Sequence, residues 1–150
     1  MLAFQLRVWD TAGIERFTVM SPSYYKDASA VIVCFALNDR ESFGCTSQYV
    51  LEAVDQTKTA KIFLCGTKLD IISENPVTSE DIENFAQQLD SVVCGTFQVS
   101  SRTGQGVHEM FESVGKIMAR IVNEKCDPSR IRVSLTAKNV DGEAEQKRCC

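Results

Sequence analysis

An acidic residue followed by a turn, close to the start of the chain, is the first feature that could support chemistry. Asp10 ends an apolar stretch, and Thr11, Ala12 and Gly13 come directly after it. An acid at the carboxyl end of a strand, followed by a turn of small residues, suits a site for magnesium and phosphate. The same D-x-x-G pattern occurs in ordinary surface turns, so its meaning depends on the rest of the chain.

A lysine and an acid follow a second apolar stretch, residues 61–65, in the motif Gly66-Thr67-Lys68-Leu69-Asp70. A carboxylate at this place can accept hydrogen bonds from the N1–H and exocyclic amine of guanine, a pair of donors that adenine lacks. The lysine stem can lie along the ring system of the base. The alternative is a surface turn with an incidental ion pair.

A third loop begins with Ser100, Ser101 and Arg102, directly after the apolar residues 92–99. Backbone N–H groups in such a loop can donate to the carbonyl oxygen of a base. Three loops of this kind, in this order and each after a predicted strand, favour a nucleotide site over three unrelated surface turns.

The elements that must position these loops alternate along the chain. Apolar runs predict strands over residues 2–9, 30–37, 61–65 and 92–99, of which 30–37 has the pattern of a strand buried on both faces. Helices are predicted over about 41–56, with Phe43, Val50 and Val54 on one side, and over about 107–122. Between them a helix follows the capping box of Thr78 and Asp81.

This alternation is typical of an α/β fold with a parallel sheet. Ligands of such sheets bind beyond the carboxyl ends of the strands, so the three loops should open on the same edge.

Composition limits the class of protein. With 150 residues, the chain is long enough for one domain with a real core, and a net charge of -4 argues against nucleic acid as a partner. No apolar run is long enough to span a bilayer, and the chain opens without a signal-peptide pattern. Among its seven cysteines, Cys34, Cys65 and Cys94 lie in strand-like runs and are expected to be small buried hydrophobic residues. An odd number of cysteines without a signal favours the reducing cytosol.

In combination, the three loops resemble the guanine-nucleotide signatures of Ras-like small GTPases. Tyr24-Tyr25, the apolar run 32–37 and the terminal Cys149 and Cys150 are most similar to the Rab branch. The resemblance covers about residues 2–122 and the last two cysteines. It implies the three-layer α/β fold of P-loop NTPases, with a parallel sheet, and GTP or GDP with Mg²⁺ as cofactors.

The resemblance also assigns roles to residues. Asp10, acting indirectly on magnesium, and Gly13 would face the metal and the γ-phosphate, and residues 10–25 would form the second switch. Thr67, Lys68 and Asp70 would recognise guanine, and residues 100–102 would hold the base. The GTP-binding residues implied in this way are Asp10, Thr11, Ala12, Gly13, Thr67, Lys68, Asp70, Ser100, Ser101 and Arg102.

The chain departs from the family pattern on the phosphate side. No G-x-x-x-x-G-K-[ST] motif occurs in it, so the first strand, P-loop, first helix and second strand of the fold are expected to be lacking. We therefore expect low stability and weak or no GTP binding, with Met1 an internal methionine of a longer protein or the start of a short isoform.

Single residues also depart from the pattern. Ile14 occupies the position of the glutamine that orients the attacking water, which predicts slow hydrolysis unless a partner supplies the missing group. Thr67 replaces asparagine and Arg102 replaces lysine, which predicts guanine preference with reduced affinity.

Residues 1–122 are expected to form the partial GTPase domain, and residues 123–150 a flexible C-terminal tail. Cys149 and Cys150 resemble the Rab signal for two geranylgeranyl groups, which would anchor the protein on the cytosolic face of intracellular membranes. The family resemblance implies effectors, an exchange factor, a prenylation escort and a GDP-dissociation inhibitor as partners.

Two hypotheses follow. The first is a Rab-like GTP/GDP switch in vesicle traffic. The second is a lipid-anchored, non-enzymatic interaction protein that binds effectors or escorts without nucleotide. An unrelated flavodoxin-like domain is a remote third, because it would require all three loops to coincide by chance.

Overall fold

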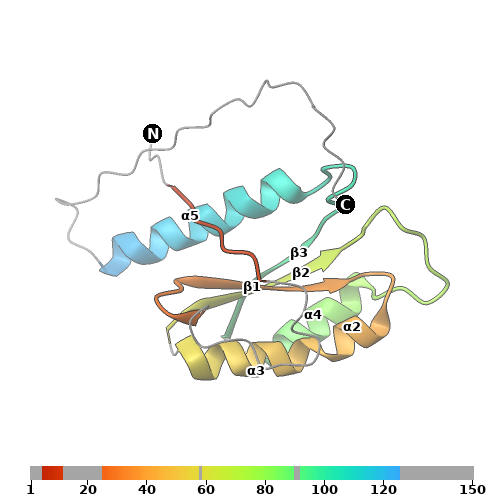
Figure 1. Ribbon diagram of the computed structural model, residues 1–150, viewed down its shortest axis with the longest axis horizontal. Helices are drawn as coiled ribbons and strands as arrows, with labels where there is room; N and C mark the ends of the chain where they lie inside the picture. The colour runs from red at the N-terminus through yellow and green to blue at the C-terminus, as the bar shows by residue number, and fades with distance from the viewer. Residues whose placement is uncertain (1–4, 12–24, 58, 90–91, 126–150) are drawn as a thin grey trace, which may run out of the picture.

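The computed structural model describes residues 5–11, 25–57, 59–89 and 92–125, with side chains up to residue 122 (Figure 1). Strands and helices alternate in it. The strands are β1 (Ala30–Ala36), β2 (Lys61–Thr67) and β3 (Val93–Gln98). The helices are α2 (Arg40–Gly44), α3 (Thr46–Thr57), α4 (Ser79–Gln88) and α5 (Val107–Lys125).

The described strands form one parallel sheet in the order β1-β2-β3. Ala30 pairs with Lys61 at one end of the β1–β2 ladder and Ala36 pairs with Thr67 at the other. The parallel α/β class predicted from the sequence is therefore confirmed, as are the strands at 30–37, 61–65 and 92–99, within one or two residues at their ends.

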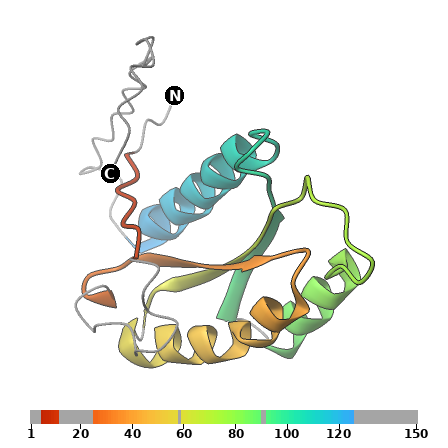
Figure 2. The ribbon, with the colours of Figure 1, turned by 45° about the vertical axis from the view of Figure 1, so that its right-hand side comes forward.

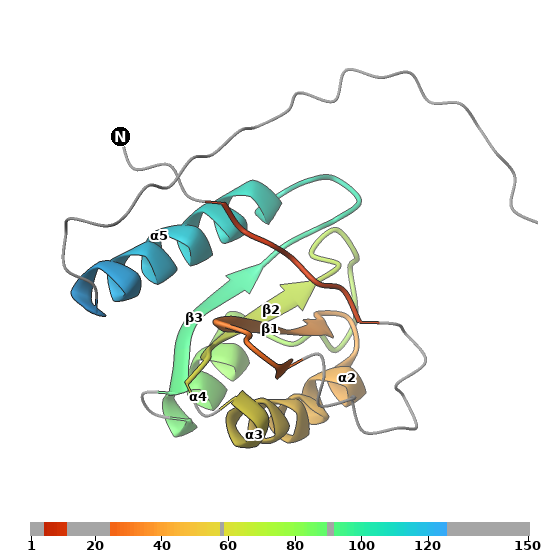
Figure 3. The same cartoon turned by 60° about the vertical axis from the view of Figure 1, so that its left-hand side comes forward.

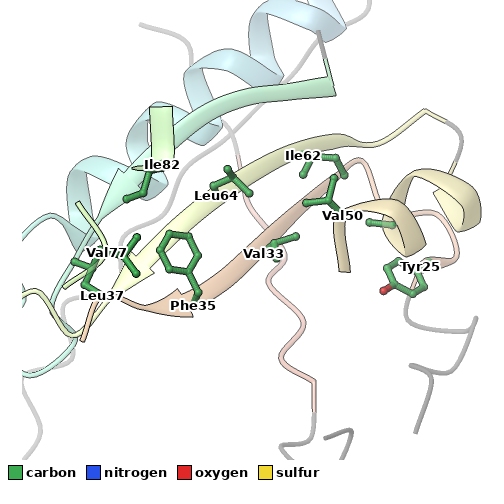
Figure 4. Packing of buried hydrophobic residues seen from close by; sticks show 10 residues of the cluster. Tyr25, Val33, Phe35, Leu37, Val50, Ile62, Leu64, Val77 and Ile82 are labelled. Carbon is green, nitrogen blue, oxygen red and sulfur yellow. The ribbon is translucent and has the colours of Figure 1, made fainter. Parts of the chain in front are cut away.

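Helices cover both faces of the sheet, so the domain has three layers. Figure 2 shows α2, α3 and α4 on one side and α5 on the other. The larger core lies under α3 and α4 (Figure 4), where Val50 and Ile82 pack against side chains of β1 and β2 such as Phe35 and Leu64. A smaller core joins Cys65 and Val99 to Met110 of α5.

Side-chain caps fix where two helices begin. Asp39 precedes α2 and accepts hydrogen bonds from the backbone N–H groups of Glu41 and Ser42. Thr78 and Asp81 form the predicted capping box at the start of α4, each side chain accepting from the other's backbone N–H. These bonds satisfy donors that the first turn of a helix leaves open.

The single helix predicted over residues 41–56 is two helices, α2 and α3, with a break at Cys45. Gly44, a poor helix former, precedes the break. On α3, Val50 and Ala53 are fully buried, whereas Val54 is 41% exposed. Val50 and Val54 are four residues apart in α3 and lie on one side of it, as predicted, but only Val50 is buried.

The apolar run of β1 had predicted a strand buried on both faces, but only one face of β1 is buried. Val33 and Phe35 are buried on the α3 side, but Cys34 points to the other face and is exposed. The smaller core is built on Cys65 and Val99, and of β1 only Ile32 packs against it. Cys65 is buried as expected, and Cys94 is half-buried.

The strand predicted over residues 2–9 is wrong over its described part. Residues 5–9 are exposed and carry no strand pairing, although Figure 3 shows them running on the same side of the sheet as α5. A strand is stabilised by its ladder of hydrogen bonds and by cross-strand packing, and this segment has neither. Trp9 is consequently 82% exposed.

The helix predicted from residue 107 is confirmed as α5, which continues to Lys125. Met110 and Val114 on its predicted inner face are buried. Within the described residues, no helix combines the length and apolar character needed to cross a bilayer.

Candidate nucleotide-binding site

Two of the three predicted loops lie side by side beyond the carboxyl ends of β2 and β3. The backbone N–H of Leu69 donates to the carbonyl of Val99 over 3.0 Å, and that of Val99 donates to the carbonyl of Gly66 over 2.8 Å. These bonds extend the β2–β3 pairing past the ends of the strands. The structure therefore brings residues 67–70 and 100–102 together, as the parallel topology predicted.

Gly66 permits close packing between the end of β2 and Leu37, which follows β1. A Cβ atom on it would lie 2.5 Å from Leu37 Cδ2, which is closer than non-bonded carbons approach. Leu37 is itself buried, and its backbone N–H donates to the carbonyl of Thr67 over 2.9 Å. Glycine at the end of β2 therefore lets the end of β1 pack against the loop.

Asp70 is held in one orientation by Ser100. The Ser100 hydroxyl donates to Asp70 Oδ1 over 2.5 Å and also accepts from the backbone N–H of Thr103 over 3.1 Å. Ser100 is fully buried, whereas the Asp70 side chain keeps 15% of its surface exposed. The carboxylate is thus fixed by a buried partner while part of it still faces solvent.

The same contacts keep Asp70 ionised. The hydrogen bond from Ser100 lowers the pKa of Asp70 most, and its own backbone N–H and the charge of Arg102 lower it further, against a smaller opposing effect of desolvation. An ionised carboxylate has two oxygens with lone pairs to spare after one bond from a hydroxyl. It can therefore accept two parallel N–H donors from one edge of a ligand.

Arg102 contributes little to holding the carboxylate. Its Nη1 atom is 4.0 Å from Asp70 Oδ2, and its side chain is 85% exposed. Pairs of this kind contribute little to stability because water screens them. The alternative interpretation of the lysine–acid loop, a surface turn whose acid makes an incidental ion pair, therefore does not account for Asp70, whose main partner is the buried Ser100.

Thr67 and Lys68 take different places in the loop. The Thr67 hydroxyl donates to the carbonyl of Phe35 over 2.8 Å, so it bridges β2 to β1. Lys68 is exposed and has a φ of 61°, in the left-handed region. This conformation carries strain for a residue with a side chain and turns the backbone sharply between Thr67 and Asp70.

The serine loop is closed by its own backbone. The N–H of Ser100 donates to the carbonyl of Gln105, and the N–H of Gly104 donates to the carbonyl of Ser100, each over 2.9 Å. Ser101 and Arg102 are exposed on the outside of this turn. The predicted base-holding positions 100–102 are therefore the first part of a compact loop that continues to Gln105.

Gly106 also shapes this loop, although no role was predicted for it. It has a φ of 74°, and a Cβ atom on it would lie 2.6 Å from the carbonyl oxygen of Gln98. The Gly104-x-Gly106 pattern directly before an amphipathic helix was the available signal, because glycines at such points often mark left-handed backbone.

A second missed residue is Arg40, at the start of α2. Its guanidinium donates to Asn75 Oδ1, to the carbonyl of Pro76 and to Asp81 Oδ2, over 2.9, 3.1 and 2.8 Å. Arg40 thus ties the segment that follows Asp70 to both α2 and α4. Partners 35 to 41 residues away in the chain leave no local sequence signal.

The first predicted loop, residues 10–13, is not shown joined to the loops at 67–70 and 100–102 in the described part of the chain. Asp10 is exposed and Thr11 is half-buried, both in a segment without strand pairing, while Ala12, Gly13 and Ile14 lie outside the described residues. The charge of Asp10 raises the pKa of the Cys34 thiol on β1. In the described part of the chain, no group of three or more His, Cys, Asp or Glu side chains could hold a metal ion.

The site has the features of a nucleotide-binding α/β domain: a parallel sheet, loops beyond its carboxyl ends, and a buried serine that orients an ionised carboxylate. The sequence matches the Ras family over residues 2–120, and the chain belongs to this family of small GTPases.

Proteins of the Rab group are among its relatives. Ras-related protein Rab-24 of Dictyostelium discoideum is 31% identical over 147 residues, which cover 97% of this chain and 72% of that protein. Ras-like GTP-binding protein RYL2 of Yarrowia lipolytica is 29% identical over 159 residues, covering 97% of this chain and 74% of that protein. Human Ras-related protein Rab-4A is 31% identical over 129 residues, covering 85% of this chain and 58% of that protein. Rab-like resemblance is thus confirmed.

Proposed function

We propose that this chain is a Rab-like protein of membrane traffic that recognises guanine through Asp70, with most of its nucleotide contacts on the base rather than on the phosphates. The observation that carries the proposal is the bond from buried Ser100 to Asp70 Oδ1. It presents an ionised carboxylate of fixed orientation beyond the ends of β2 and β3, where ligands of such sheets bind.

The surrounding residues support recognition of a planar base. Asp70 accepts from N1–H and the exocyclic amine of guanine, and the exposed Lys68 lies along the ring system. Ser101 and Arg102, exposed at the outer side of the serine loop, present backbone N–H groups to the base carbonyl. The Thr67 hydroxyl donates to the carbonyl of Phe35, so Thr67 holds the loop in place and makes no hydrogen bond to the base.

The phosphate side supports weaker binding. The 150 residues contain no G-x-x-x-x-G-K-[ST] motif, and Asp10 is an exposed acid in an unpaired segment. Mg²⁺ in this family neutralises phosphate charge, and a lone carboxylate without further ligands is a poor site for it. The described residues therefore support recognition of guanine more than binding of the magnesium–phosphate group.

Slow hydrolysis is part of the same proposal. Ile14 has no group that could orient an attacking water. In a form of the protein that binds GTP, Ile14→Gln should raise the rate of single-turnover GTP hydrolysis. An unchanged rate would show that Ile14 does not limit hydrolysis.

Membrane attachment is proposed through Cys149 and Cys150. Two prenyl groups would anchor the protein stably to the cytosolic face of a membrane, where one would not. The partners would be those of a Rab: effectors, an exchange factor, a prenylation escort and a GDP-dissociation inhibitor. Intact-mass analysis of the membrane-bound protein should show two added geranylgeranyl groups, and unmodified cysteines in that fraction would refute the anchor.

The second candidate is a lipid-anchored interaction protein that uses no nucleotide. The exposed Asp10 segment and the absence of the P-loop motif from the 150 residues favour it. The two candidates differ in one property that can be measured directly, the binding of guanine.

Ligand-observed NMR on the purified full chain, with GDP, ADP and guanosine, separates them. The first candidate predicts saturation transfer to GDP and guanosine but not to ADP. Because the base supplies most contacts, GDP and guanosine should differ in Kd by less than about tenfold, or about 1.4 kcal/mol. Equal binding of ADP would refute guanine recognition. No binding to the folded chain, verified by circular dichroism, would favour the second candidate.

A further inference from the structure

Two cysteines occupy neighbouring positions on adjacent strands. Cys34 of β1 and Cys65 of β2 are direct partners in the parallel register, so their side chains leave the sheet on the same face. Neighbouring strands lie about 4.8 Å apart, which is inside the range of about 4.4–6.8 Å between the Cα atoms of disulfide-linked residues. Phe97 occupies the matching position on the other side of Cys65. Of its two neighbours in the sheet, only Cys34 can form a disulfide with it.

The two thiols differ in access to solvent. Cys65 is 2% exposed and packs with Val99 and Met110 under α5, whereas Cys34 is exposed. A small oxidant dissolved in water therefore reaches Cys34 first. Cys65 then lies beside it as a second thiol that such an oxidant does not reach directly.

The interaction between the thiols favours the same order of reaction. Hydrogen bonding from Cys65 lowers the pKa of Cys34, and this outweighs partial desolvation of the thiol and the charge of Asp10, which both raise it. The same contact, together with burial, raises the pKa of Cys65. Cys34 is therefore the thiol that more readily becomes a thiolate, and Cys65 the one that keeps its proton.

We propose that Cys34 and Cys65 form a peroxide-sensitive pair, in which Cys34 is oxidised first and Cys65 then closes a reversible disulfide between β1 and β2. In the first step the Cys34 thiolate attacks one oxygen of hydrogen peroxide, the O–O bond breaks, and Cys34 sulfenic acid and hydroxide form. In the second step the Cys65 sulfur attacks the sulfenic sulfur, the S–O bond breaks, and the Cys65 proton leaves with the hydroxyl group as water. Overall, two thiols and one peroxide give one disulfide and two waters.

The disulfide would be readily reduced. Cβ atoms of parallel partners point in the same direction about one strand spacing apart, farther than the mean Cβ separation of about 3.8 Å in disulfides. Strained disulfides have more oxidising potentials and are the labile ones. A thiol reductant should therefore restore both cysteines, as expected of a reversible modification rather than a structural bridge.

The chain allows a clean test, because trypsin places the relevant cysteines in separate peptides. Cys34 falls in residues 27–40, Cys45 in residues 41–58 and Cys65 in residues 62–68. Cys45 is the matched control, since it is also exposed but lies between α2 and α3 rather than in the sheet. The full chain is treated with hydrogen peroxide, alkylated, digested without reduction and analysed by mass spectrometry.

The expected product is peptide 27–40 joined to peptide 62–68, and it should disappear after reduction. In Cys65→Ser, dimedone should instead trap sulfenic acid on Cys34, at least about tenfold faster than on Cys45. Cys34→Ser, a change at an exposed position, should abolish the joined peptide without changing the circular dichroism spectrum. Absence of the joined peptide from the folded wild-type chain, or equal dimedone labelling of Cys45, would overturn the proposal.

Discussion

The base side of the site (residues 67–70 and 100–102) and the Asp10 segment (residues 5–11) have similar sequence patterns but different structures. In each, an acid follows an apolar run: Asp10 comes directly after residues 2–9, and Asp70 comes five residues after the run 61–65. Asp70 follows a strand that is paired on both sides, and buried Ser100 fixes its carboxylate. Asp10 follows a segment without pairing, and it is exposed. The comparison teaches that a motif positions its acid only when the strand before it is held in a sheet.

The largest expected difference between the two regions is in stability. Phe63, in the central strand, is fully buried, so Phe63→Ala should lower the free energy of unfolding by about 3–5 kcal/mol. Trp9→Ala should change it by less than about 0.5 kcal/mol because the side chain is mostly exposed. Urea denaturation followed by circular dichroism measures both. A cost of Trp9→Ala close to that of Phe63→Ala would show that the Asp10 segment is packed after all.

A smaller effect tests why the serine loop holds its shape. Gly106→Ala should lower the free energy of unfolding by about 2–3 kcal/mol. The new side chain is strained by the left-handed backbone, and its Cβ also comes too close to the Gln98 carbonyl oxygen. Gly104→Ala is the control, with a φ of 81° and no atom within 4 Å of the added Cβ. It should cost only about 1 kcal/mol, from backbone strain alone. If urea denaturation gives the same loss of unfolding free energy for both variants, the contact with the Gln98 carbonyl oxygen does not contribute.

The segment that follows Asp70 is fixed by the cap of α4. Thr78→Ala removes the hydroxyl that accepts from the Asp81 N–H, and should cost about 1 kcal/mol of unfolding free energy. Thr59→Ala, at an exposed threonine outside any helix or strand, should stay within about 0.5 kcal/mol. A Thr78 variant as stable as the Thr59 variant would mean that the capping box does not stabilise α4.

The smallest expected effect is on acid stability. Hydrogen bonds from Thr78 and the charge of Arg40 lower the pKa of Asp81 below its ordinary value of 3.8. A lowered pKa in the folded state stabilises the fold above the pKa of the unfolded chain, and this contribution is lost as the pH falls through the folded value. Asp81→Asn should therefore make the urea midpoint fall less steeply below about pH 4. An unchanged slope would contradict the shift.

Much of the base side could be predicted from sequence, because its signals are local. The apolar runs of β2 and β3, the capping box before α4 and the order of the loops are all visible in short windows. The partners of Asp70 and Arg40 could not be predicted in the same way. Ser100 is 30 residues from Asp70, and Arg40 is 41 residues from Asp81, so only the folded sheet brings them together.

The errors have a common physical origin. An apolar run shows that a segment can form a strand, but not whether a neighbour is present to pair with it. Residues 5–9 have the composition of a strand but pair with no neighbouring strand. Cys34 lies in an apolar run typical of a buried strand, but its side chain is exposed. The sites proposed at Asp10, Gly13 and Ile14 therefore stay predictions, whereas Asp70 and Ser100 have defined geometry.

A change of base preference tests the central claim, guanine recognition by Asp70, most directly. Asp70→Asn replaces one acceptor with an N–H donor, which no longer suits the exocyclic amine of guanine but suits the carbonyl that xanthine has at that position. Ligand-observed NMR should show guanosine binding to the wild-type chain and to the control Asp55→Asn, and xanthosine binding to Asp70→Asn. If guanosine binds equally well to the folded Asp70→Asn variant, Asp70 does not recognise the base.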